Sequence, residues 1–315
     1  MDLPFEPMLL HRERQPFADD GWLYQVKWDG VRNLTLVADG AVHHWSRRLR
    51  DRSQLFPEFA GLAQVFGGQR AVLDGEIVVL RDGKPNFPAI LERDLASAAP
   101  DPRKIRSIPA TLMIFDLLEL GPDPLYTRPL QERLDLLARL VPEAEAWQVV
   151  ASFPGRSGPD LFAAVVAQGL EGVVAKRLGS PYIPATRSRD WLKVKRRQRT
   201  LAVICGFTVP VGRPGGLVLG AYHEGRLLYI GRAGSGITGS DLAMLKAHLP
   251  PAPRPFDYEP TLRDRFTPGP VGPVVWTEPR MTVQVDFTEW TEDLKLRDPV
   301  VAGFSTEPPE AARIE

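Results

Sequence analysis

The sequence predicts an α+β protein built from two domains. Its 315 residues exceed the roughly 250 at which a single hydrophobic core stops growing, so two cores are expected. Up to residue 199, strand-like runs alternate with helical stretches, and from residue 200 onward short strands dominate. We therefore expect a first domain of residues 1–199, with antiparallel sheets and flanking helices, and a second domain of residues 200–315 that forms a small β-barrel.

The first domain begins as antiparallel sheet. Apolar and polar residues alternate across residues 22–46, and Asp39-Gly40 predicts a hairpin turn within this stretch. Residues 71–80 repeat the pattern and turn at Asp82-Gly83, and the apolar run of residues 111–120 is short enough to be a buried strand. The remaining elements expected here are helices over residues 130–140 and 161–170 and strands over residues 172–176 and 191–195.

The second domain is dominated by short strands. They are expected over residues 201–209, 217–222, 226–230, 274–276 and 282–287, with one helix over residues 241–248. Five short strands and one helix suit a small Greek-key barrel such as an OB-fold. The proline- and glycine-rich residues 251–273 predict a long surface loop, and residues 305–315 predict a frayed tail.

Composition excludes several classes of protein. Basic and acidic side chains number 39 each, so the net charge of zero indicates no partner. The single cysteine, Cys205, excludes a disulfide scaffold and a thiolate metal cluster. No apolar run approaches the ~18 residues of a membrane span, and the first residues lack the pattern of a signal peptide. We expect a cytoplasmic protein without membrane association.

Residues 26–32 carry the clearest chemical signal, the pattern K-x-D-G-x-R that begins at Lys27. A lysine can lose its proton and attack an electrophile, whereas an arginine stays protonated, and only 8 of the 39 basic residues are lysines. Gly30 allows a backbone to approach a ligand, and Arg32 suits a phosphate or ribose. The pattern therefore indicates a nucleophile beside a phosphate-binding group, the alternative being an exposed hairpin turn.

Other charged residues suit phosphate chemistry. Glu76 and Glu171 lie in apolar, strand-like surroundings, and isolated carboxylates near phosphates commonly hold Mg²⁺, although each also suits a surface salt bridge. Lys193 and Lys195 alternate with apolar neighbours, so both ammoniums should face the same side of a strand. Phe115, within an apolar run, suits core packing more readily than stacking on a ligand.

Two basic runs indicate contact with a nucleic-acid backbone. Residues 187–199 hold seven basic side chains and one acidic side chain. Residues 47–52 hold four arginines and one aspartate. Such runs are usually solvated faces, but these two lie beside the segments suited to phosphate. The glycine-rich residues 231–236 form either a simple turn or a loop in which Arg232 contacts DNA.

Together these motifs resemble those of the covalent nucleotidyltransferases, specifically small bacterial ATP-dependent DNA ligases such as ligase C and the ligase domain of ligase D. Six segments match in the family's order along nearly the whole chain: residues 27–32, Ser46-Arg47, residues 73–76, Phe115-Asp116, residues 171–176 and residues 191–195. The resemblance implies a nucleotidyltransferase domain followed by an OB-fold domain.

The resemblance also implies residue roles. Lys27 would form the covalent bond to AMP, Arg47 would hold the 5′-phosphate of a nick, and Phe115 would stack on adenine. The implied nucleotide-binding set is Gln25, Val26, Arg32, Arg47, Glu76, Phe115, Lys193 and Lys195. The implied ligands of Mg²⁺ or Mn²⁺ are Glu76 and Glu171, and the implied DNA-binding residues are Arg47, Arg48, Arg187, Arg196, Arg197 and Arg232.

The implied reaction has three steps. Lys27 attacks the α-phosphate of ATP and releases pyrophosphate, AMP moves to the 5′-phosphate at a nick, and the 3′-hydroxyl then displaces AMP. The partners expected from this reaction are nicked duplex DNA and, in trans, a repair polymerase or end-binding proteins. A monomer associated with the nucleoid is expected.

Two positions depart from the family pattern. Gln25 stands where relatives commonly carry an acid that accepts a hydrogen bond from the adenine amino group, which an amide oxygen also accepts. Ser305 replaces an arginine of the last motif, which leaves Arg297 to orient pyrophosphate. An RNA-capping guanylyltransferase, an RNA ligase and a non-catalytic DNA-binding scaffold are the alternatives.

Overall fold

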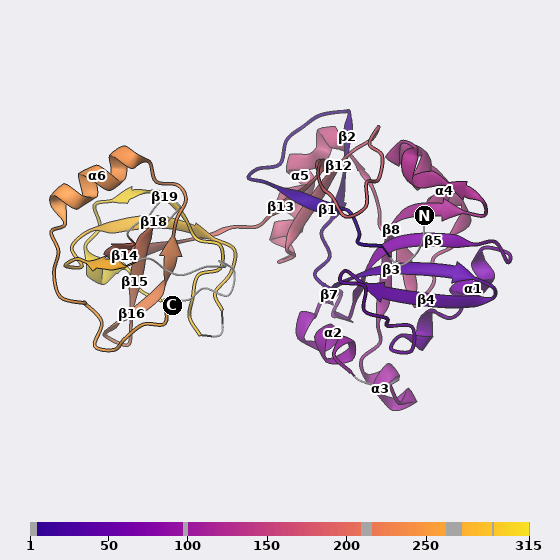
Figure 1. Cartoon of the computed structure of the whole chain (residues 1–315), viewed down its shortest axis with the longest axis horizontal. Helices are drawn as coiled ribbons and strands as arrows, with labels where there is room; N and C mark the ends of the chain where they lie inside the picture. Colours follow the sequence, from indigo (N-terminus) through magenta and orange to yellow (C-terminus); the bar gives the residue numbers. More distant parts are fainter. Residues whose placement is uncertain (1–4, 97–99, 209–215, 263–272, 292, 315) are drawn as a thin grey trace. The chain divides into compact units, whose positions relative to one another are not determined.

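The computed structural model describes residues 5–96, 100–208, 216–262, 273–291 and 293–314. The chain divides into two compact units, residues 1–196 and 197–315 (Figure 1). The sequence-based boundary at residue 200 lies inside the first strand of the second unit. None of the helices in the described ranges has the length and apolar character needed to cross a membrane.

Two sheets build the first unit. The first has the order β1 (Leu9–Glu13), β13 (Arg187–Lys195), β12 (Gly172–Arg177), β2 (Trp22–Val26), β11 (Phe153–Pro154). The second has the order β10 (Trp147–Val149), β8 (Thr111–Leu120), β5 (Ala71–Val78), β3 (Val31–Ala38), β4 (Ala41–Ser46), with β9 (Asp123–Pro124) paired to β8. A separate hairpin joins β6 (Leu80–Arg81) and β7 (Lys84–Pro85). The pairs are antiparallel except β1–β13 and β8–β10.

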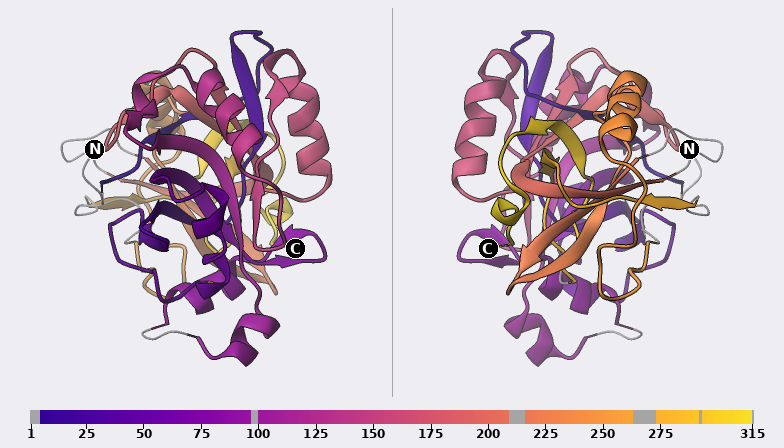
Figure 2. Two further views of the ribbon diagram at one scale, coloured as in Figure 1. Left: turned by 90° about the vertical axis from the view of Figure 1, so that its right-hand side faces the viewer. Right: turned by 90° about the vertical axis from the view of Figure 1, so that its left-hand side faces the viewer.

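The described part of this unit also contains the α-helices α1 (Leu62–Val65), α2 (Phe87–Asp94), α3 (Pro102–Ser107), α4 (Leu130–Leu140) and α5 (Gly158–Ala167). The leucines that recur at helical spacing in α4 are buried against the second sheet, as their period predicts. Helix α5 covers β2 and β12 of the first sheet (Figure 2). Helices α2 and α3 were not predicted, although their cap residues Asn86 and Asp101 precede a proline in the first or second helical position.

The predicted hairpin turns are confirmed. Asp39-Gly40 connects β3 to β4 and Asp82-Gly83 connects β6 to β7, and all four residues have positive φ. Positive φ at both central residues is the requirement of a type I′ turn, whose twist matches that of the strands. The alternative of a hairpin at Asp29-Gly30 is wrong, because this corner joins β2 and β3, which belong to different sheets.

The second unit is a six-stranded antiparallel sheet. Its order is β16 (Arg226–Ala233), β15 (Leu217–His223), β14 (Gln198–Thr208), β18 (Thr282–Phe287), β19 (Val300–Ser305), with β17 (Val274–Trp276) paired to β14. Helix α6 (Gly239–His248) starts at a capping box formed by Thr238 and Asp241. The core of this unit is separate from that of the first and gathers the inward faces of the strands with Leu245 and Leu249.

Two expectations for the second unit need correction. Within the described residues of this unit, the sheet does not close into a barrel through strand pairing, since β16 and β19 are its edges and a hydrogen bond from Val301 N to Ser235 O connects their ends. The expected frayed tail is instead packed. Strand β19 runs to Ser305, and Ala312 is fully buried and accepts a hydrogen bond from Tyr222 N at its carbonyl oxygen. Of the expected loop at residues 251–273, residues 263–272 lie outside the described part, as does Val209 of the first expected strand.

Candidate active site

A pocket of the first unit joins the motifs that the sequence singled out. Its lining comes from both sheets and comprises Leu10, Gln25, Val26, Lys27, Trp28, Arg32, Glu76, Phe115, Val150, Val174, Lys176 and Trp191. Of the eight residues that the resemblance assigns to the nucleotide, five line this pocket together with Lys27. The fold therefore brings together side chains that lie up to 90 positions apart in the sequence, from Gln25 to Phe115.

Lys27 follows the last residue of β2, and its backbone N–H donates to Gly172 O at 2.9 Å. Its ammonium forms an ion pair with Glu171, and Lys195 forms another with the second oxygen of the same carboxylate. All three side chains are mostly buried, with exposed fractions of 18%, 19% and 24% for Lys27, Glu171 and Lys195. Burial opposes ionisation of Glu171, but the charges of the two lysines outweigh it and lower its pKa.

Lys193 belongs to the same cationic group. In β13, Leu192 and Val194 pack into the core beneath α5, so the alternating lysines face the other way, as predicted. Burial, followed by repulsion from Lys195 and Lys27, lowers the pKa of Lys193 to about 8. Two lysines thus contact one carboxylate with a third lysine in electrostatic range, and this surplus of positive charge suits a polyanion.

Glu76 lines the pocket from β5. Burial raises the pKa of Glu76 to about 7, although Lys27 and Arg32 counteract part of that effect. The described residues contain no cluster of three or more histidine, cysteine, aspartate or glutamate side chains suited to a metal. The two carboxylates Glu76 and Glu171 nevertheless fit Mg²⁺, since this cation commonly binds one or two carboxylates together with water and substrate phosphates.

Arg32 is held rigidly by groups of the protein. Its guanidinium donates to both oxygens of the buried Asp74 at 2.6 Å and to Met8 O at 3.1 Å. Asp74 also accepts from the hydroxyl of Tyr182 at 2.7 Å. The same guanidinium lies 4.7 Å from the ring centroid of Phe115. Arg32 is therefore fixed in orientation at the pocket wall.

Gln25 and Phe115 also line the pocket. The amide of Gln25 is 2% exposed, and its Nε2 donates to Ser152 Oγ at 3.0 Å, which leaves the amide oxygen as the acceptor for a ligand. Phe115 packs against the core and also lines the pocket, so its stacking on adenine stays a prediction with which this position is compatible. Val26 lies between Gln25 and Lys27 in the lining.

Several predicted residues do not line this pocket. Arg47 and Arg48 are exposed beyond the end of β4, Arg187 donates to Leu10 O, and Arg196 is exposed after β13. In the second unit, Arg197 donates to Asp298 O at 3.4 Å. Arg232 is corrected: it lies within strand β16 rather than in a loop, and its Nε is buried without a hydrogen-bond partner in the described part of the chain.

Sequence reasoning also left contributors to the pocket without a role. Lys176 was recognised only as part of a motif, and Trp28, Val150 and Trp191 were given no function. Gly30 needs its small size for a reason other than a ligand, because a Cβ there would lie 2.2 Å from Ile77 O of β5. Only the pairing of distant strands reveals these contacts.

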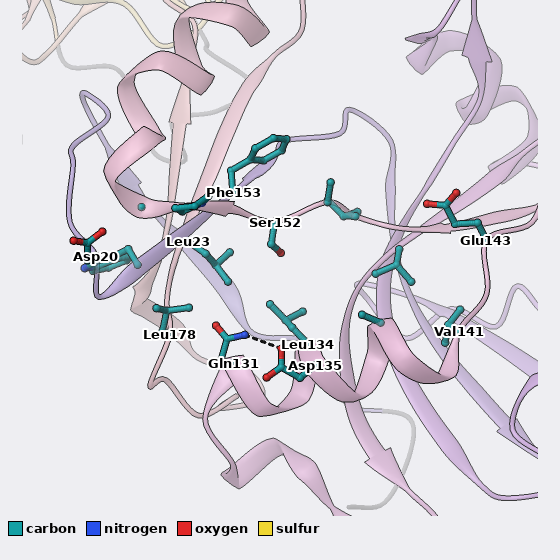
Figure 3. Close-up of a pocket in the computed structure, with 17 residues that line it drawn as sticks. Asp20, Leu23, Gln131, Leu134, Asp135, Val141, Glu143, Ser152, Phe153 and Leu178 are labelled. Atoms are coloured by element: carbon teal, nitrogen blue, oxygen red, sulfur yellow. Dashed lines mark hydrogen bonds between the residues drawn. The ribbon is translucent and has the colours of Figure 1, made fainter.

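A second, larger pocket of the first unit has a volume of about 630 Å³ and opens between α4 and the segment that contains Ser152 and Phe153 (Figure 3). Its charged residues are all acidic: Asp20, Asp135 and Glu143. It contains none of the motif residues. Such a lining does not suit a phosphate ligand, so the smaller pocket around Lys27 is the candidate site.

Comparison with known proteins agrees with this geometry. The family model "ATP dependent DNA ligase domain" matches residues 7–195, and "ATP dependent DNA ligase C terminal region" matches residues 211–307. The multifunctional non-homologous end joining protein LigD of Pseudomonas aeruginosa is 32% identical over 91% of the chain and 34% of its own length. DNA ligase 1 of Korarchaeum cryptofilum is 30% identical over 89% of the chain and 51% of its own length.

Solved structures give the same result. The crystal structure of the ligase domain from Mycobacterium tuberculosis LigD is 30% identical, covers 99% of this chain and 98% of that one, and superposes with a TM-score of 0.55. The chain spans about a third of the length of the LigD proteins it matches. Its fold is the α+β arrangement of a nucleotidyltransferase domain followed by the ligase C-terminal domain. The chain therefore belongs to the ATP-dependent DNA ligase family.

Proposed function

We propose that the chain seals nicks in duplex DNA, with Lys27 carrying AMP as a covalent intermediate. The observation that carries this proposal is the position of Lys27, paired with Glu171, in a pocket whose lining also contains the ring of Phe115, the buried amide of Gln25 and the carboxylate of Glu76. Membership of the ligase family supports the same chemistry. The names of the LigD relatives support a place in end joining or another form of DNA repair.

ATP binds with its adenine toward Gln25 and Phe115. The amide oxygen of Gln25 accepts from the adenine amino group, because Ser152 engages the amide nitrogen. Val26 and Phe115 supply apolar surface for the base. This arrangement favours adenine over guanine, whose carbonyl at the corresponding position cannot donate to an amide oxygen.

The proton of Lys27 leaves through Glu171. Phosphate oxygens compete with Glu171 for Lys195 and Lys193, so the arriving triphosphate frees the carboxylate from one of its two partners. Glu171 then accepts the proton of Lys27, the Nζ lone pair forms a bond to the α-phosphorus, and the bond to pyrophosphate breaks. The lysines and Arg32 stabilise the negative charge on the phosphate oxygens during this in-line transfer.

Glu76 and Glu171 would hold Mg²⁺ at this site, where the cation would neutralise phosphate charge. The DNA partner is proposed to be a nicked duplex, contacted through its backbone by Arg47, Arg48, Arg187, Arg196, Arg197 and Arg232. AMP moves from Lys27 to the 5′-phosphate held by Arg47, and the 3′-hydroxyl displaces it. End-binding proteins and a repair polymerase are proposed as partners in trans.

Lys27→Arg tests the covalent step. Arginine keeps the charge of the site but stays protonated, so the variant should form no protein-bound AMP, whereas the native chain becomes labelled by ATP carrying label in the α-phosphate. Label from GTP in place of ATP would instead favour a capping enzyme. Labelling of the arginine variant would refute the assignment of Lys27.

Lys195→Ala tests the phosphate role. Loss of this cation should reduce self-adenylation and nick sealing by about tenfold or more, because one charge-assisted contact to phosphate is removed. The exposed Lys246→Ala, on α6, is the matched control and should retain native rates. Native sealing by the Lys195 variant would exclude its role in phosphate binding.

A further inference from the structure

Lys176 is the lysine of the candidate site for which the reaction has no use. It lies in β12, is 2% exposed and lines the pocket. Its ammonium lies 4.4 Å from the ring centroid of Phe115 and 4.0 Å from that of Trp191. The two rings meet edge to face, with centroids 6.1 Å apart. The ammonium of Lys176 thus lies against two aromatic rings at the pocket wall.

A hydrogen bond of the Lys176 side chain connects the two sheets. Its Nζ donates to the backbone carbonyl of Phe115 at 3.1 Å, from β12 of the first sheet to β8 of the second. The pairing of β5 with β8 explains why this carbonyl needs a donor. Asp74 opposes Asp116 and Gly75 opposes Ile114, so Phe115 is the extra residue of a β-bulge and has no partner on β5.

The bulge determines where the ring of Phe115 lies. An extra residue changes the direction of the side chain, here toward the pocket, but leaves its peptide group outside the ladder. On the C-terminal side, Asp116 is anchored by two hydrogen bonds of 2.8 Å to the buried Arg133. The carbonyl of Phe115 is anchored by Lys176. Both anchors are needed, since a buried carbonyl without a donor destabilises the conformation that contains it.

A lysine suits this position better than an arginine would. Burial lowers the pKa of Lys176 to about 7, with Arg32 and Arg133 acting in the same direction and Asp116 and Asp74 opposing them. A neutral amine still donates a hydrogen bond, so the contact to Phe115 persists on either side of that pH. A guanidinium would remain charged in the same enclosure.

We propose that Lys176 is a positioning residue: it holds the β-bulge at Phe115 and so presents the aromatic ring to the adenine of ATP. The inference rests on the proposed function for the identity of the ligand. It assigns to Lys176 an effect on nucleotide affinity and none on the transfer of AMP to Lys27.

Affinity for α,β-methylene-ATP, which cannot transfer AMP, separates this inference from the proposed function. Calorimetric titration of Lys176→Met should give a dissociation constant about tenfold above that of the native chain, because the bulge loses its donor. The rate of self-adenylation at saturating ATP should stay within about twofold of native. Lys176→Gln, which keeps a neutral donor, should give an intermediate dissociation constant. This variant replaces Lys176→Met in the test if the methionine variant does not fold.

The double variant shows whether Lys176 acts through the ring. Once Phe115→Ala has removed the ring, adding Lys176→Met should change the affinity by no more than about twofold. Lys295→Met is the matched control, because Lys295 donates to the carbonyl of Tyr229 and lies over its ring but does not line the pocket. It should bind the nucleotide with native affinity.

Two results would overturn the inference. One is native affinity in a folded Lys176→Met chain, and the other is an equal loss of affinity with and without the Phe115 ring. Absence of the AMP adduct in the native chain would instead refute the proposed function and leave the affinity measurement to decide the role of Lys176.

Discussion

At the scale of single residues, burial and neighbouring charges determine which groups of the site are ionised. The strand context of Glu76, Glu171 and Lys193 was visible in the sequence, but their protonation was not. It depends on charges from other strands, such as the two lysines that share Glu171. The same environment that prepares these groups for chemistry therefore also affects stability.

Glu76 allows this effect on the free energy of unfolding to be measured. Its pKa rises from 4.5 to about 7 on folding, so between these values the folded chain holds a proton that the unfolded chain has lost. Stability falls as the pH rises through this window and stays reduced above it. Glu76→Gln, which removes the charge, should raise the melting temperature above pH 7 by a few degrees, for a difference on the order of 1–3 kcal/mol.

The difference between Glu76→Gln and the native chain should disappear as the pH approaches 4.5. Thermal melting from pH 4.5 to 8.5 checks it, with the exposed Glu145→Gln as the control that follows the native profile. A variant that is less stable than the native chain at pH 8 would show that the carboxylate gains more from Lys27 than burial costs it.

At the scale of elements, the site depends on where strands of the two sheets approach one another. The corner between β2 and β3 carries the K-x-D-G-x-R motif from the first sheet to the second, and Gly30 lies against the backbone of β5. A side chain at Gly30 would push β3 away from β5 at the strand that carries Glu76.

Gly30→Ala should therefore destabilise the chain and impair adenylation together. The added Cβ would lie 2.2 Å from Ile77 O, so we expect a loss of about 2 kcal/mol or more in the free energy of unfolding. Gly179→Ala is the control, since its Cβ would meet nothing within 4 Å, and it should stay within about 0.5 kcal/mol of native. Denaturant unfolding measures both, and equal stabilities would contradict the close approach.

At the scale of the whole molecule, the largest hydrophobic cores of the two units are separate. One belongs to residues 1–196 and includes the candidate site, and the other belongs to residues 197–315. Because the pocket is built by the first unit alone, a nucleotide bound there stabilises that unit by mass action.

Calorimetry of the intact chain should therefore resolve two unfolding transitions. ATP should raise the midpoint temperature of the transition of the first unit. Phe287→Ala, which removes a fully buried ring from the core of the second unit, should lower the midpoint temperature of the other transition. A single transition that both changes shift together would show that the units unfold as one.

Much of the candidate site was accessible from the sequence because its chemistry depends on residue type and order. The lysine motif, the paired lysines of β13 and the two glutamates are recognisable in the sequence itself. All of them lie within residues 7–195, which match the model of the ligase family. Strand alternation and turn residues likewise predicted most of the strands, because both reflect local backbone geometry.

Tertiary structure alone decided how these parts meet. It placed the bulge at Phe115, brought Lys176 to that residue's carbonyl and paired one glutamate with two lysines. It also packed the C-terminal residues that were expected to be frayed, and in the described part of the second unit it left the sheet open at β16 and β19. Periodicity and residue type record which face of a strand is buried, but register shifts and contacts between sheets depend on strands that are distant in the sequence.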